Sequence, residues 1–188
     1  MTLAGLFPLL SQSTQHQGLL ELLKPGQAMG QAVLLDSALP YWLGALRPAL
    51  NIPITVLVPR HDRARRVYED LLVWCGNHAE VYQLPEGETL PLERLMADDA
   101  TTHRRICALA ALLNLDEDRH QIPPIVIASV AALSQKTLSK EVFQAACHYV
   151  SVGQRINLGN VLERWQAMGY RAGPVVEVPG MVSRRGGI

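Results

Sequence analysis

Two uninterrupted apolar runs constrain the fold of this 188-residue chain more than any other feature. Residues Ile54–Val58 and Ile125–Val130 are rich in β-branched side chains. Pro59 follows the first run and Pro124 precedes the second. Strands that are buried on both faces of a parallel sheet have continuous apolar sequences of this kind, whereas half-exposed strands alternate. The two runs therefore predict inner strands of a parallel sheet.

Shorter runs and helical stripes complete the predicted layer. Residues 32–35 and 79–84 predict two further strands. Apolar residues recur at i, i+3, i+4 and i+7 in the segments between the strands, which is typical of helices with one buried face. The first helix is expected to be capped by Asp62 and to end at Gly76, and the second to cover about 102–114; their expected buried residues are Ala64, Val67, Leu71, Trp74, Ile106, Leu109, Ala110 and Leu113. This alternation predicts a doubly wound α/β layer with right-handed crossovers.

The pattern changes after about residue 133. Residues 147–152 alternate like a strand with one exposed face, and Asn157 is placed to cap a helix that ends at Gly169. Residues 175–178 and 181–183 flank Pro179–Gly180 and predict a hairpin. We therefore expect a helical lead-in over 1–30, the α/β layer over 31–135 and a small α+β domain over 136–188.

Composition excludes several classes of protein. Lysine plus arginine equals aspartate plus glutamate, at 17 each, which argues against a general nucleic-acid binder because phosphate neutralisation needs excess positive charge. The three cysteines form no CxxC pair, so neither a zinc site nor a disulfide framework is predicted. No apolar run approaches the ~20 residues of a membrane span, and no basic secretory leader is present. A cytoplasmic protein without membrane contact is expected.

The turn after the first predicted strand lacks the residues of a phosphate-binding loop. Such a loop needs glycines for close backbone approach, a lysine for the phosphates and a hydroxyl for magnesium. Residues 36–40 contain neither glycine nor lysine, and Pro40 removes one backbone N–H. We predict no nucleotide here. The alternative, a small α/β enzyme or nucleotide-binding protein with a divergent phosphate site at residues 36–44, rests on the strand–turn–helix pattern alone.

Other charged and nucleophilic groups give weak signals. The basic segment 60–66 is expected to be a solvated helix face whose charge Glu69 and Asp70 reduce, and the alternative is contact with DNA or an acidic partner. Glu86, Glu88, Glu93, Asp98 and Asp99 crowd one loop, where the two aspartates favour a helix start more than acid–base or metal chemistry. The histidines are scattered and the serines form no nucleophile motif. No catalytic, cofactor or metal residue is predicted in this segment.

Two adjacent arginines near the last residue of the sequence are the strongest remaining candidates. Arg184 and Arg185 lie between small residues after the predicted hairpin turn. A guanidinium group presents several N–H donors in a planar fork, which suits bidentate binding of a carboxylate. The alternative is an exposed arginine pair without a function.

Several motifs in a fixed order resemble the family of bacterial transcription-repair coupling factors (Mfd). The loop Glu88–Leu95, which reads ETLPLERL, is the most specific of them. The others are Arg104–Ile106 with Ala108–Leu109, Ile125–Leu133, Val152–Gln154, Leu162–Glu163 with Met168–Tyr170, and Glu177–Gly180 leading into Arg185–Ile188. The resemblance covers roughly residues 30–188 and implies the UvrB-like amino-terminal module of that family. UvrB itself carries an intact phosphate loop, which residues 36–40 lack.

The resemblance also implies a partner and its contact residues. In the family, an arginine followed by glycine on the hairpin of the small domain contacts UvrA, the damage-recognition ATPase of nucleotide excision repair. Arg185 and Gly186 match this pair, whereas Arg184 matches a position that is not reliably basic. Further contact residues, an arginine and a phenylalanine on the next strand, would lie beyond Ile188, so a truncated small domain is expected. ATP, magnesium, RNA polymerase and double-stranded DNA are implied only for domains absent from this chain.

Overall fold

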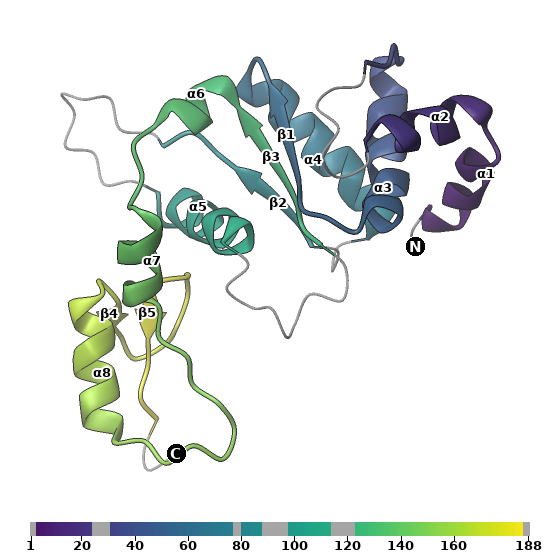
Figure 1. Cartoon of the computed structure of the whole chain (residues 1–188). Helices are drawn as coiled ribbons and strands as arrows, with labels where there is room; N and C mark the ends of the chain where they lie inside the picture. The colour runs from purple at the N-terminus through teal and green to yellow at the C-terminus, as the bar shows by residue number, and fades with distance from the viewer. Residues whose placement is uncertain (1–2, 24–30, 77–79, 88–97, 114–122, 186–188) are drawn as a thin grey trace. The chain divides into compact units, whose positions relative to one another are not determined.

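The computed structural model describes residues 3–23, 31–76, 80–87, 98–113 and 123–185. The chain forms two compact units, one of residues 1–86 with 104–135 and the other of residues 87–103 with 136–188 (Figure 1). The described elements are η1 (Ala4–Leu6), α1 (Phe7–Ser11), α2 (Thr14–Leu22), η2 (Asp36–Ala38), α3 (Leu39–Leu50), β1 (Ile54–Val58), α4 (His61–Cys75), β2 (Val81–Leu84), α5 (Asp99–Leu112), β3 (Ile125–Ser129), α6 (Val130–Ser134), α7 (Lys140–Ala146), α8 (Leu158–Ala167), β4 (Arg171–Ala172) and β5 (Met181–Val182).

The first unit contains a parallel sheet in the order β1-β3-β2. β3 is the central strand, with Ile125 level with Ile54 on one side and with Val81 on the other. All five residues of β3 are buried, because neighbouring strands cover its edges and helices cover its faces. The predicted parallel sheet is confirmed, and 125–129 is its inner strand as predicted. The prediction that 54–58 is also an inner strand is wrong: β1 lies at the edge of the described sheet and Thr55 and Leu57 are exposed, because residues 32–35 supply no further strand beside it. Val130, which was predicted to continue the strand, instead begins α6.

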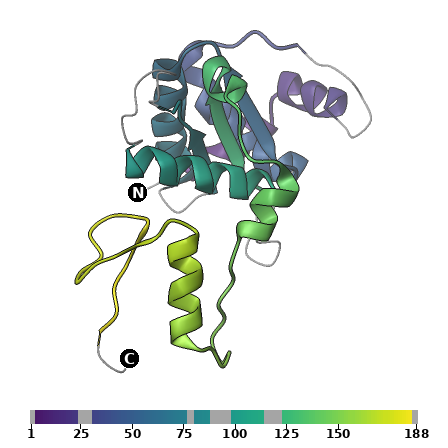
Figure 2. The same cartoon turned by 90° about the vertical axis from the view of Figure 1, so that its left-hand side faces the viewer.

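Helices cover both faces of this sheet. Alternate residues of β3 point to opposite sides, so Ile125 and Ile127 pack with α3 and α4, while Val126 and Ala128 pack with α5 and α6. Figures 1 and 2 show α4 and α5 on opposite sides of the strands. The predicted mixed α/β class is confirmed. The relation of this layer to UvrB and to a degenerate phosphate loop stays a prediction.

An aromatic cluster attaches the amino-terminal helices to the layer. Tyr41 of α3 and Trp74 of α4 have ring centroids 4.7 Å apart, and Phe7 of α1 lies 6.0 Å and 6.2 Å from these two rings. A Cβ atom on Gly44 would lie 2.6 Å from the Phe7 ring, so a larger residue there would force this ring to move. Glycine thus permits the close approach of α1 to α3.

The second unit is built around α8. Asn157 caps this helix by accepting a hydrogen bond from the Asn160 backbone N–H at 3.2 Å, and Gly169 ends it with a φ of 98°. Both features were predicted. Trp165 of α8 donates from Nε1 to Nδ1 of His148 at 3.0 Å, which ties the helix to the segment before it. The assignment of this unit as a UvrA-binding domain stays a prediction.

Three predicted strands are wrong. Residues 32–35 and 147–152 pair with no strand in the described part of the chain, and Val33 is 93% exposed. Residues 175–178 are likewise not a strand. Pro179–Gly180 does form a turn, but the strand it leads into, β5, pairs in parallel with β4 rather than as a hairpin. A continuous or alternating sequence alone does not form a strand, because each strand needs a neighbour to satisfy its backbone groups.

Two details of the predicted helices are also wrong. Helix α4 begins at His61 after Arg60, so Asp62 lies in the first turn and is not the cap. Helix α5 buries Thr101, Ala108 and Ala111, while Ile106 is 50% exposed. The prediction placed larger side chains such as Ile106 on the buried face of α5. The structure instead buries small residues there, which allow the helix to lie close to the sheet. Ala64, Val67 and Leu71 of α4 are buried as predicted.

Candidate partner-binding site

The arginine pair follows a minimal strand ladder. β4 and β5 pair in parallel, with Arg171 level with Met181 and Ala172 level with Val182. The Arg171 N–H donates to the Gly180 carbonyl at 2.9 Å, and the Gly173 N–H donates to the Val182 carbonyl at 3.0 Å. Gly180 has a φ of 86°, a left-handed conformation that glycine adopts without strain. This turn directs the chain into β5 and so fixes where residues 183–185 begin.

Arg184 and Arg185 are both exposed and follow β5 after one intervening residue, Ser183. Within the described residues, neither side chain makes a hydrogen bond or an ion pair. Gly186, the third predicted contact residue, lies outside the described part of the chain. The two guanidinium groups therefore present their donors to solvent, where a partner's carboxylates can reach them.

Two side-chain contacts hold the segment that carries this pair. The Ser183 hydroxyl donates to the Pro174 carbonyl at 2.7 Å, directly before Arg184. On β4, the Arg171 guanidinium donates to the Asp99 carboxylate in an ion pair between residues 72 positions apart. Sequence reasoning missed this ion pair, because no local spacing indicates it.

At the turn of residues 36–40, where a nucleotide-binding protein would have its phosphate-binding loop, a carboxylate is bound to an arginine. Arg63 of α4 donates to both oxygens of Asp36, at 2.7 and 2.8 Å. The hydrogen bond and charge of Arg63 lower the pKa of the Asp36 carboxyl, and the charge of Arg66 lowers it further. Because Asp36 already occupies the Arg63 guanidinium, that cation is not available for a phosphate, and this geometry does not favour the alternative of a nucleotide site at 36–44.

The basic segment at the start of α4 is largely paired within the chain. Arg60 lies 3.4 Å from Asp62, and Arg65 lies 3.8 Å from Glu69 in an i,i+4 pair. With Arg63 on Asp36, three of its arginines have carboxylate partners. The segment thus has the character of a solvated helix face, with Glu69 reducing its charge as expected.

The acidic loop contributes a helix cap. The Asp98 carboxylate accepts from the Thr101 backbone N–H at 3.0 Å, and α5 begins at the next residue, Asp99. The prediction that these aspartates favour a helix start is confirmed. Glu86 accepts from the Ser129 hydroxyl at 2.6 Å, which joins the ends of β2 and β3. Glu88 and Glu93 lie outside the described residues.

The described residues offer little for metal or nucleophilic chemistry. They contain no group of three or more His, Cys, Asp and Glu side chains arranged to hold a metal ion. Cys75, Cys107 and Cys147 are free thiols of intermediate exposure. Burial raises the pKa of the Cys75 and Cys107 thiols, which makes them poor nucleophiles at neutral pH. Among these residues, no helix has the length and apolar character required to span a bilayer.

Two known proteins are similar to nearly the whole chain, although no protein-family model matches it. The transcription-repair-coupling factor of Myxococcus xanthus is 30% identical over 169 residues, or 87% of this chain. The transcription-repair-coupling factor of Bacillus subtilis is 28% identical over 173 residues, or 92% of this chain. The chain spans 14% of the length of each relative. Over most of its length, this chain is therefore a homologue of the transcription-repair-coupling factors.

Proposed function

We propose that this chain takes part in transcription-coupled nucleotide excision repair as a non-catalytic module that binds UvrA. The observation that carries the proposal is the exposed arginine pair after β5, which has no partner among the described residues, in a chain homologous to coupling factors. Arg185 is the principal contact, Gly186 follows it, and Arg184 has a lesser role. The module acts in the cytoplasm.

The charge of residues 136–188 supports a carboxylate-bearing partner. These residues contain seven lysines and arginines but only three acidic residues, whereas residues 87–103 of the same unit contain four acidic residues and one arginine. A basic surface increases the rate of association with an acidic one and favours the correct orientation. Arg184 and Arg185 add bidentate hydrogen-bond donors to this field, so they supply geometric selectivity as well as charge.

The rest of the proposed activity belongs to other parts of the coupling factor. We propose that ATP and magnesium are used by a translocase motor outside this segment. RNA polymerase and double-stranded DNA are likewise bound by those other parts. On this proposal, ATP hydrolysis needs no residue of this chain. The chain contributes to repair by recruiting UvrA.

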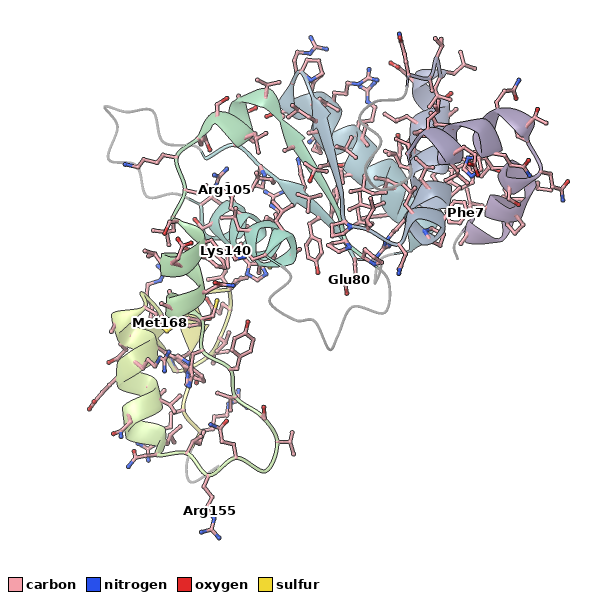
Figure 3. All side chains as sticks on the ribbon, viewed as in Figure 1. Phe7, Glu80, Arg105, Lys140, Arg155 and Met168 are labelled. Atoms are coloured by element: carbon pink, nitrogen blue, oxygen red, sulfur yellow. The ribbon has the colours of Figure 1, made fainter. Side chains whose placement is uncertain are left out.

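Calorimetric titration of UvrA with the purified chain tests the proposal. Arg185→Ala should weaken binding by about 1–3 kcal/mol, as for the loss of a charge-assisted hydrogen bond. Arg184→Ala should weaken it less. Arg155→Ala is the matched control, because Arg155 is also an exposed arginine of the second unit and its side chain extends away from the ribbon (Figure 3). Equal affinities for the Arg185 and Arg155 variants would sink the assignment of Arg185.

A further inference from the structure

We infer that Asp99 is a positioning residue that holds β4, and through it the segment that carries Arg184 and Arg185. The inference rests on the proposed function, since it gives the arginine pair a fixed location for its partner. Asp99 lies in the first turn of α5, in the part of that helix that belongs to the second unit. Its carboxylate receives the Arg171 guanidinium, and Arg171 is the first residue of β4.

The strand ladder needs such an anchor because it is very short. It contains two residue pairs, and two backbone hydrogen bonds connect its strands at Arg171 and Gly173. An isolated two-stranded ladder is at best marginally stable in water, even when it is longer than this. A side-chain contact from outside the ladder therefore makes a large relative difference to how often it is formed.

Asp99 is well placed to act as that anchor. The Asp98 carboxylate caps α5 at Thr101, which fixes the beginning of the helix. Asp99 lies in the first turn of α5, a position that helices favour for acidic residues.

The arginines of this region thus divide into two kinds. Arg171 is occupied within the chain by Asp99, whereas Arg184 and Arg185 have no partner among the described residues. The contacts run in sequence from Asp99 to Arg171, from β4 to β5, and from β5 into residues 183–185. Removing the Asp99 charge should loosen the arginine pair without changing either arginine.

The experiment compares Asp99→Asn and Asp99→Glu in the whole chain by two measurements. Amide hydrogen exchange, followed by NMR without UvrA, should be about two- to five-fold faster at Arg171 and Gly173 in Asp99→Asn, the range for losing an exposed ion pair. Calorimetric affinity for UvrA should fall by a similar factor. Asp99→Glu keeps the charge and should restore both values towards those of the wild type.

Glu177→Gln is the matched control. Glu177 is an exposed acidic residue of the same unit and makes no ion pair in the described structure. Its substitution therefore removes the same charge as Asp99→Asn without breaking an ion pair. Unchanged exchange at Arg171 and Gly173 in Asp99→Asn would overturn the inference, as would faster exchange with unchanged or tighter UvrA binding. If the wild-type chain does not bind UvrA, the proposed function fails, and exchange alone then decides whether Asp99 holds the ladder.

Discussion

Different kinds of interaction stabilise the two units of this chain. In the first unit, buried apolar side chains fill both faces of a parallel sheet, and Leu71, Ile125 and Ile127 are fully enclosed. In residues 136–185 of the second unit, Val161 is the one buried side chain. Caps and long-range polar contacts connect its remaining segments, as at Asn157, Trp165 and Arg171.

This difference indicates where partner binding is expected. Burial of apolar area is the dominant favourable term in folding, so the first unit has the means to fold around its own core. Both units expose large apolar side chains, such as Val33 and Leu35 in the first and Val152 and Val176 in the second. In residues 136–185 almost no buried core accompanies them, so binding a partner would supply apolar contacts that these residues lack.

The largest expected effect comes from deleting buried side chains in each unit. Leu71→Ala should lower the free energy of unfolding by about 2–5 kcal/mol, because it removes a fully buried side chain and leaves a cavity. Val161→Ala removes fewer methyl groups at a 7% exposed position and should cost about 1–2 kcal/mol. Urea denaturation followed by circular dichroism measures both values.

Leu138→Ala is the control for these deletions, because Leu138 is 59% exposed and its loss should change stability by less than about 0.5 kcal/mol. A cost for Val161→Ala equal to that for Leu71→Ala would contradict the comparison. It would mean that the buried core of the second unit contributes as much to the free energy of unfolding as that of the first.

A smaller effect is expected at the cap of α8. Asn157→Ala removes the acceptor for the Asn160 N–H and should destabilise the second unit by about 1 kcal/mol. Asn157→Asp keeps an oxygen acceptor and should stay close to the wild type. Hydrogen exchange at the α8 amides reports the change locally. Equal exchange in the alanine and aspartate variants would show that the cap contributes nothing.

The smallest effect concerns the Asp36–Arg63 pair and acid. Since Arg63 lowers the pKa of folded Asp36, the unfolded chain binds more protons at that site as the pH falls. The pair's contribution is therefore fully present above the ordinary aspartate pKa of about 4 and is lost as pH falls through the lower folded value. Asp36→Asn should lower the urea midpoint slightly at pH 7, and the difference should shrink towards pH 2. A difference that does not change with pH would contradict this role.

The parts of the fold that could be predicted are those whose sequence allows one arrangement. Ile125–Ser129 is largely apolar on both faces, so burial between helices is its most favourable state, whereas the similar run Ile54–Val58 became a half-exposed edge strand. Helix α8 carries its own start and end signals in Asn157 and Gly169. Arg184 and Arg185 are exposed, as both interpretations of the pair required, although the hairpin predicted to carry them does not form.

The rest depended on contacts between distant parts of the chain. Residues 32–35 have strand-forming sequence, but a strand requires a neighbour, and sequence does not specify which segment supplies it. The buried face of α5 was misjudged because Ala108 and Ala111 pack through their small size rather than their hydrophobicity. The Asp99–Arg171 pair joins residues 72 positions apart, and only the folded structure brings them together.

Hydrogen exchange of the whole chain with and without UvrA tests the central claim most directly. If the second unit is the binding surface, UvrA should protect amides around β4, β5 and residues 183–185, while β1, β2 and β3 exchange as before. Protection confined to the first unit, or equal protection across both units, would contradict the account.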